Sequence, residues 1–319
     1  MYRIFLLLAF ILCSFQSAAR VSDAAKELLL KLIPAQYLAS EADVMGKIEV
    51  VEWKEKADGT KLTTSEMGAS YVYHGCCLKY YTNQRRPAGY SNFDYKFNIE
   101  NAAGHNIDTY AAAKKFVRIF NPELDLEHEY CLISRETQKQ CDIFRWRRML
   151  QGFFYLNDEI GVAMYKDGTL FTLRVDEGRR CSINEKITAD TALNVLKRVI
   201  TWRFALFNLI EAGLMSSVHY SYEQPSKYIV RKNDFFDGTF IYPLKSAFFC
   251  DICVKDSNVN RLAWVIRVNI DNPDVIKELH ARGFNAFIDA ETGELIGGCY
   301  GFEKPVPVDK AEDAEKKEE

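Results

Sequence analysis

Residues 261–298 constrain the fold more than any other stretch of this chain. Apolar residues occupy every second position from Leu262 to Val268, which predicts a strand with at least one buried face. Asn272 and Pro273 then predict the start of a short helix, with Gly283 as its stop. Residues 284–290 predict another strand, and a tight turn over residues 289–293 returns the chain into a last strand.

An earlier stretch follows the same plan of a helix, strands and a closing hairpin. Asp108 is expected to cap a helix over residues 109–120, followed by strands at 144–149, 160–165 and 170–175. The later unit begins with a helix over residues 188–212 and continues through strands at 227–230 and 239–243. The two stretches therefore predict two units of one design.

The segments LAWVIRVN (262–269) and FIDAETGELIGG (287–298) resemble the PepSY family. These are small α+β domains of secreted metalloprotease propeptides and of free-standing extracytoplasmic proteins. The resemblance marks Trp264, Asp289 and Gly293 as fold-motif residues, none of them catalytic. It implies an α+β fold class with two PepSY-like units, each a helix on an antiparallel sheet, at 105–180 and 181–302. Another secreted helix-on-sheet fold, such as a cystatin-like one, is the alternative.

Residues 20–104 are predicted to form an N-terminal helix plus a β-rich region ahead of these units. Ser22 is expected to cap the helix, and strands are expected at 48–53, 71–81 and 93–99, with a hairpin turn at Asp58-Gly59. Residues 303–319 are dominated by charged residues and alanine, which predicts a disordered tail.

Residues 1–19 are typical of a signal peptide. Arg3 precedes an apolar run, and small residues follow at 17–19. The run is shorter than the about 20 apolar residues that a spanning helix needs, so the mature protein is expected to be secreted or periplasmic, without membrane insertion. Cys13 leaves a lipoprotein as an alternative, although Ile11 and Leu12 lack the small residue that such processing prefers.

Composition excludes some classes of partner. The chain of 319 residues is 48% hydrophobic, which is enough to build a sizeable core. Its formal net charge of -3 gives no general attraction to nucleic acid or to an anionic membrane. The basic run Arg145-Trp-Arg-Arg148 is interpreted as a solvated strand face.

Cysteines predict a disulfide framework in an exported chain. Of nine cysteines, eight lie beyond the signal peptide: Cys76, Cys77, Cys131, Cys141, Cys181, Cys250, Cys253 and Cys299. Their connectivity cannot be deduced from the sequence. The pairing favoured here joins Cys131 to Cys141, a small loop that would contribute roughly 3 kcal/mol.

Two cysteine clusters carry alternative interpretations. Cys250 and Cys253 have the spacing of a redox pair, but the apolar residues around them indicate a strand, on which the two sulfurs would face opposite sides. With Cys76 and Cys77 they could also form a four-sulfur zinc site. Structural disulfides are the preferred interpretation of both clusters.

No other pattern predicts catalysis. His128-Glu129 lacks the second histidine of a zinc-protease helix, and His280 lies in a short amphipathic segment. We find no phosphate-binding loop and no nucleophile elbow. The sequence thus predicts no catalytic, metal-binding or cofactor-binding residue.

The expected function is that of an exported, non-enzymatic binding protein. The PepSY resemblance implies a peptidase as the protein partner, inhibited or chaperoned in trans, or another extracytoplasmic protein. An edge strand is a physically reasonable contact, although the sequence does not identify which. The alternatives are a thiol-redox or zinc enzyme and a structural envelope protein. The oligomeric state stays open.

Overall fold

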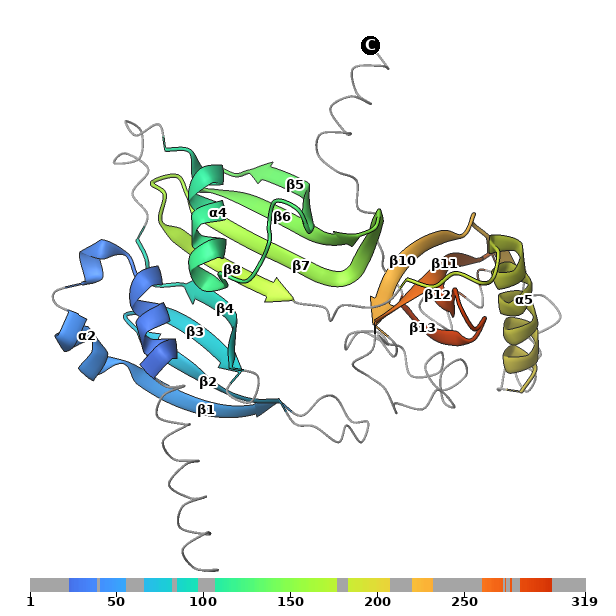
Figure 1. Cartoon of the computed structure of the whole chain (residues 1–319), viewed down its shortest axis with the longest axis horizontal. Helices are drawn as coiled ribbons and strands as arrows, with labels where there is room; N and C mark the ends of the chain where they lie inside the picture. The colour runs from blue at the N-terminus through green and yellow to red at the C-terminus, as the bar shows by residue number, and fades with distance from the viewer. Residues whose placement is uncertain are drawn as a thin grey trace, which may run out of the picture. The chain divides into compact units, whose positions relative to one another are not determined.

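The computed structural model describes residues 23–38, 41–55, 66–81, 85–96, 107–176, 183–206, 220–231, 260–271, 273, 276 and 282–299. These residues form two compact units (Figure 1). Unit 1 contains the described residues up to Arg148 together with Glu159–Asp176. Unit 2 contains Met149–Asp158 and the described residues from 183 onward.

Unit 1 is built on an antiparallel sheet. Its strands are β1 (Glu49–Glu55), β2 (Glu66–Tyr73), β3 (Cys76–Tyr81), β4 (Arg86–Asn92), β5 (Tyr130–Thr137), β6 (Cys141–Leu150), β7 (Phe153–Tyr165) and β8 (Leu170–Asp176). They are hydrogen-bonded in the order β1-β2-β3-β4-β8-β7, with β6 pairing β7 and β5 pairing β6. Strand β7 belongs to unit 1 from Glu159 onward.

Two helices cover one face of this sheet, the helix at residues 23–32 and α4 (Thr109–Phe120) (Figure 1). Asp108 begins α4 as predicted, because its carboxylate accepts hydrogen bonds from the backbone N–H groups of Tyr110 (3.1 Å) and Ala111 (3.0 Å). The short helices η1 (Ala35–Tyr37) and α2 (Glu41–Lys47) lead the chain from the first helix into β1.

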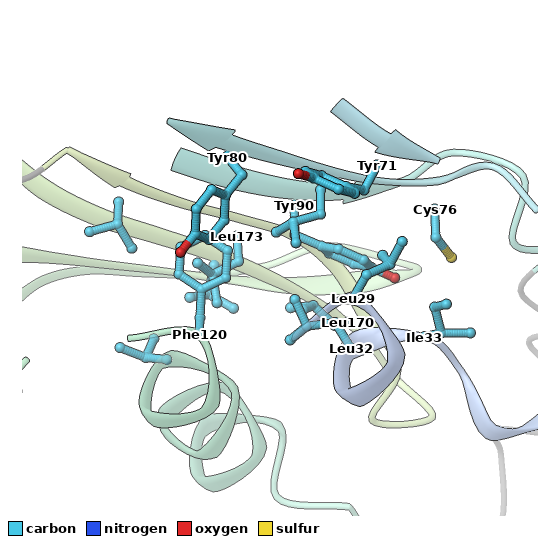
Figure 2. Packing of buried hydrophobic residues seen from close by; sticks show 14 of the residues in the cluster. Leu29, Leu32, Ile33, Tyr71, Cys76, Tyr80, Tyr90, Phe120, Leu170 and Leu173 are labelled. Atoms are coloured by element: carbon cyan, nitrogen blue, oxygen red, sulfur yellow. The ribbon is translucent and has the colours of Figure 1, made fainter. Parts of the chain in front are cut away.

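The core of unit 1 lies between the helices and the sheet (Figure 2). Leu29 from the first helix, Phe120 from α4, Tyr71 from β2 and Leu173 from β8 all belong to one cluster and are almost completely buried. Because these residues are distant in the sequence, residues from 23 to 176 contribute to a single hydrophobic core.

This arrangement corrects the expected fold class. The α+β description, two PepSY-like helix-on-antiparallel-sheet units after a β-rich N-terminal region, is wrong. Strand β4 from the N-terminal region pairs with β8 from the supposed first unit, setting Tyr90 opposite Leu173 and Ser91 opposite Thr172. Of the described residues, 50% lie in strands and 24% in helices. The backbone groups on this edge of β8 pair with those of β4 and would otherwise be exposed. The N-terminal region and residues 107–176 therefore belong to one sheet.

Unit 2 contains α5 (Ala189–Leu206) and the strands β9 (Tyr220–Tyr222), β10 (Ser226–Arg231), β11 (Asn260–Ile270), β12 (Gly283–Asp289) and β13 (Leu295–Cys299). The strands pair in the order β10-β11-β12-β13, and β9 also pairs with β11. Ala192 and Leu196 of α5 pack with Trp264 and Ile266 on one face of the sheet, while Val265 and Phe287 are buried on the other. Burial on both faces explains why Val265 interrupts the polar alternation of β11.

Several sequence predictions are confirmed within the described residues, including the strand around 262–268, which is part of β11, and the start of α5. The strand expected over 71–81 is wrong. His74 and Gly75 have positive φ values of 46° and 70°, and they form a two-residue turn between β2 and β3. Asp58-Gly59, the strand at 239–243, residues 207–212, the signal peptide and the tail lie outside the described residues. No helix of the described part of the chain has the length and apolarity to cross a membrane.

The basic run at 145–148 is only partly solvated. Arg145 is exposed, but Trp146 and Arg148 face the core side and are 2% and 8% exposed. The Arg148 guanidinium donates to Glu129 at 2.6 Å, and Arg147 pairs with Glu159. Strand alternation therefore divides these residues between two faces.

Candidate functional site

Strand β1 has an outer edge that no other strand of the described residues pairs with. All seven of its residues pair with β2, from Glu49 opposite Val72 to Glu55 opposite Glu66, and β1 ends the strand order of the sheet. Val50 and Val51 are 43% and 56% exposed. A strand edge offers backbone donors and acceptors to another extended chain.

The two exposed valines lie on opposite faces of the sheet. Val50 lies opposite Tyr71, whose side chain is in the core, and Val51 lies opposite Ser70. Directly opposed residues in an antiparallel pair share a face, so Val50 is on the helix-covered face and Val51 on the other. An added strand would therefore meet an apolar side chain on each face.

Local packing holds β1 in position. Val44 of α2 is fully buried, and Ile48, between α2 and β1, is 7% exposed; both belong to the core of unit 1. The strand carries three glutamates and one lysine. The start of β1 is thus anchored to the core by Val44 and Ile48. The strand itself has exposed valines near its start and a net negative charge.

The other sheet edges look different. Strand β5 contains a bulge between Leu132 and Ser134, and Arg135 and Glu136 are exposed on it. Such irregularity and charge are typical ways of blunting an edge. On β13, Ile296 is only 1% exposed. Sequence reasoning could not identify β1 as the exposed edge, because edge position depends on the pairing order of distant strands.

Cys76 and Cys77 lie next to each other on β3 and face opposite sides of the sheet. Cys76 belongs to the core, whereas Cys77 is partly exposed. Burial, the largest cause, raises the pKa of the Cys76 thiol to about 11. A thiol with that pKa is protonated at neutral pH, and a nucleophile or metal ligand needs the thiolate.

Cys131 and Cys141 do not pair with each other. Cys131 on β5 lies opposite Arg147, while Cys141 is the first residue of β6. The two positions are therefore roughly 20 Å apart along the hairpin, whereas a disulfide needs Cα atoms within about 7 Å. The predicted local disulfide is therefore wrong. Cys141 lies at the turn between β5 and β6, whereas Cys131 lies near the far end of the same hairpin.

The remaining cysteine predictions are not tested. Cys181, Cys250 and Cys253 lie outside the described residues, and only the backbone of Cys299 is described, as the last residue of β13. Among the described residues, no three His, Cys, Asp or Glu side chains gather as a metal site would require.

Two of the three fold-motif residues, Asp289 and Gly293, lie at the turn of the β12–β13 hairpin, and Trp264 lies in β11. The Asp289 carboxylate accepts hydrogen bonds from the backbone N–H groups of Glu291 (2.7 Å) and Thr292 (3.0 Å), and Gly293 has a φ of +76°. The indole N–H of Trp264 donates to the carbonyl of Ile187 at 3.1 Å. Asp289 and Gly293 therefore stabilise the turn, and Trp264 joins β11 to the segment before α5.

Of the two histidines considered in the sequence, His128 is placed by the structure. His128 is exposed, and its Nδ1 lies 2.8 Å from Oδ1 of Asp125. That hydrogen bond is the main cause of the raised pKa of His128. His280 lies outside the described residues.

A cluster of aromatic rings that the sequence did not predict lies at one end of the unit 1 sheet. It consists of Tyr37, His74, Phe93, Tyr95, Tyr165 and Phe171, which contact one another in a chain. Tyr37 stacks on His74 with ring centroids 5.7 Å apart, and Tyr95 lies 5.0 Å from Tyr165. Phe93 is 74% exposed. The contributing segments are far apart in the sequence, so only the fold brings them together.

The fold and these sites define a two-unit, largely antiparallel β protein with one exposed, acidic edge strand. No protein-family model matches the chain, and no curated protein matches it. Among solved structures, the Bacillus megaterium YpeB C-terminal domain is similar at 12% sequence identity and a TM-score of 0.34, over 86% of this chain and 95% of that chain. A likeness at this level establishes no family.

Proposed function

We propose that this chain is an exported binding protein without catalytic activity, which takes up an extended segment of a protein partner along β1. The observation that carries the proposal is the outer edge of β1, seven residues long, with Val50 and Val51 exposed on its two faces. Main-chain hydrogen bonds would supply affinity, and the alternating side chains would supply specificity.

The charge of β1 defines the chemistry of that segment. On the face of Val51, the strand carries the exposed Glu49; on the face of Val50, it carries the exposed Glu52. Opposite charges facing each other across two strands stabilise the pair, and like charges destabilise it. The fitting partner segment therefore alternates basic and apolar residues.

The finer part of the proposal concerns the identity of the partner. The resemblance of residues 262–298 to propeptide domains implies a peptidase, engaged in trans, and another extracytoplasmic protein is the alternative. No observation in the described residues favours the thiol-redox or zinc alternative, because Cys76 and Cys77 face opposite sides and the pKa of Cys76 is raised to about 11.

Binding of a labelled synthetic peptide to the purified full chain tests strand addition. The probe alternates lysine and valine, and its controls replace lysine with glutamate or place proline at the centre. Fluorescence anisotropy should show binding of the lysine peptide and weaker binding of both controls. Val51→Lys should reduce binding more than Val51→Glu, because both remove the valine but only lysine repels the probe. Val51 is 56% exposed, so both variants should fold. Equal binding of the lysine and glutamate peptides would contradict the proposal.

Inhibition assays test the peptidase separately. The chain is added to purified secreted metallopeptidases, and the initial rate of cleavage of a small substrate is measured. Inhibition that Val51→Lys removes would support a peptidase partner. Unchanged rates across the panel, with the peptide still bound, would reject the peptidase and leave strand addition in place.

A further inference from the structure

A row of polar residues crosses the buried face of the unit 1 sheet. Tyr73 on β2, Cys76 on β3 and Asn92 on β4 lie opposite one another in register, and Tyr90 precedes Asn92 by two residues on the same face. Cys76 and Asn92 are fully buried, and Tyr90 is 2% exposed. This is an unusual set of side chains for the interior of a sheet.

Two polar atoms in this row, Oδ1 and Nδ2 of Asn92, are buried and lack a hydrogen-bond partner among the described residues. The Tyr90 hydroxyl is buried on the same face, and its partner is the weakly accepting sulfur of Cys76. Turning the Asn92 amide by half a turn exchanges its oxygen and nitrogen but leaves both atoms unpaired. Buried polar groups in folded proteins are almost always hydrogen-bonded to protein or to ordered water.

The side chains packed against the row are apolar. Leu29, Leu32 and Ile33 lie beneath Tyr90 and Cys76, with Leu170 beside them (Figure 2). Burial raises the pKa of both the Cys76 thiol and the Tyr90 phenol, and the Tyr90 hydroxyl donates a hydrogen bond to the Cys76 sulfur. Both groups are therefore uncharged at neutral pH. The charged side chain that acts on Cys76 is the carboxylate of Asp94.

These properties select the ligand. An anion would be repelled by Asp94, and a soft metal ion would need a thiolate that the raised pKa of Cys76 withholds. The Asn92 amide and the Tyr90 hydroxyl oxygen present a donor and acceptors on the same buried face of the sheet, which matches a small neutral molecule that can both donate and accept.

We propose that Asn92 and Tyr90 hold one internal water molecule. The Nδ2 group of Asn92 donates to its oxygen, and its hydrogens go to Oδ1 of Asn92 and to the hydroxyl oxygen of Tyr90, which itself donates to the sulfur of Cys76. A buried water makes about three such hydrogen bonds. It links the Asn92 amide to the Tyr90–Cys76 pair between β4 and β3, independently of the proposed function of β1.

A double-mutant cycle on the full chain tests this site. Tyr90→Phe and Asn92→Leu each remove hydrogen bonds to the water, so each should lower the urea midpoint of unit 1. Their combined effect should be smaller than the sum, because the first substitution already releases the shared water. The control pairs Asn92→Leu with Tyr80→Phe, whose hydroxyl donates to the Arg85 carbonyl at 2.8 Å near the other end of β3. That control pair should be additive.

Crystallographic density provides the direct readout. Density for a water within hydrogen-bonding distance of Asn92 Nδ2 and the Tyr90 hydroxyl should be present in the wild type and absent in the double variant. An Asn92 amide bonded directly to protein groups would overturn the proposal. Additive effects of Tyr90→Phe and Asn92→Leu, or an unchanged midpoint in Asn92→Leu, would overturn it as well.

Discussion

Replacing Leu29 with alanine tests whether the first helix and residues 107–176 share one core. Leu29 is fully buried and belongs to the same cluster as Phe120 of α4 and Leu173 of β8. Removing a fully buried leucine side chain costs about 2–5 kcal/mol, from lost transfer energy and from the cavity that remains. That loss is a large share of the about 5–15 kcal/mol that stabilises a typical domain.

Hydrogen exchange read by mass spectrometry measures the extent of the effect. A loss of about 2 kcal/mol speeds the exchange of the most protected amides about 30-fold, and a loss of about 5 kcal/mol speeds it several thousand-fold. If unit 1 has one core, Leu29→Ala should increase exchange in β8 and α4 as well as in β2–β4. The amides of β11 and β12 should keep their protection.

A matched substitution in unit 2 controls for the chemistry of the change. Leu196 on α5 is also fully buried, but it packs with Trp264 and Ile266 of unit 2. Leu196→Ala should therefore increase exchange in β11 and β12 and leave β8 protected. If Leu29→Ala affected residues 23–38 and 66–92 alone, the single core of unit 1 would be refuted, and a separate N-terminal region would be restored.

Three further outcomes follow from single residues. At pH 8 about one thousandth of Cys76 is thiolate, since its pKa is about 11, so iodoacetamide should modify it only after unfolding, as peptide mass spectrometry would show. Gly283→Ala should destabilise unit 2 by roughly 1–3 kcal/mol, because a Cβ at residue 283 would lie 2.2 Å from the Val268 carbonyl oxygen. The control is Gly161→Ala, which should leave the denaturation midpoint unchanged because a Cβ there would meet no atom within 4 Å. Burial alone raises the pKa of Asp142, but hydrogen bonds from Lys166 and Thr109 bring it below its usual value. A carboxyl whose pKa is lower in the folded than in the unfolded chain stabilises the fold fully at pH values above its unfolded pKa of about 4. This stabilisation is lost as the pH falls through the pKa of the folded state. Asp142→Asn should therefore cost stability at neutral pH and much less in acid, in urea denaturation at both pH values.

A single helix or strand could be predicted where its own residues contain the capping or alternation pattern that defines it. Asp108 caps α4, and the alternation after Arg261 gives β11. The pairing between Tyr90 and Leu173 could not be predicted, because nothing in either strand records the identity of its distant partner. Hydrophobic alternation indicates which face of a strand is buried, but it does not indicate which strands are neighbours in the sheet. The pairing of β4 with β8 is what made the predicted fold class wrong.

Turn chemistry explains a second difference. Residues 71–81 are rich in aromatic residues, so they predict one long strand, yet His74 and Gly75 both adopt positive φ and reverse the chain. Histidine is less common than asparagine or aspartate in the first position of such a turn. A side chain at residue 75 would also approach the Asp94 side chain to 2.4 Å, which is why glycine occupies that position.

The glutamates of β1 favour a foreign strand over a second copy of the chain. In an antiparallel pair of two β1 strands that uses all seven residues, Glu52 would face itself and Glu49 would face Glu55. Like charges directly opposite each other are destabilising, and edge charges are a common protection against self-association. A basic segment in the same place would be attracted. Glu52→Gln should consequently weaken binding of the lysine-valine peptide and increase dimer formation in sedimentation velocity, while the exposed Lys31→Gln on the first helix should change neither. Peptide binding that stays the same in Glu52→Gln would mean that the acidic edge does not select the partner.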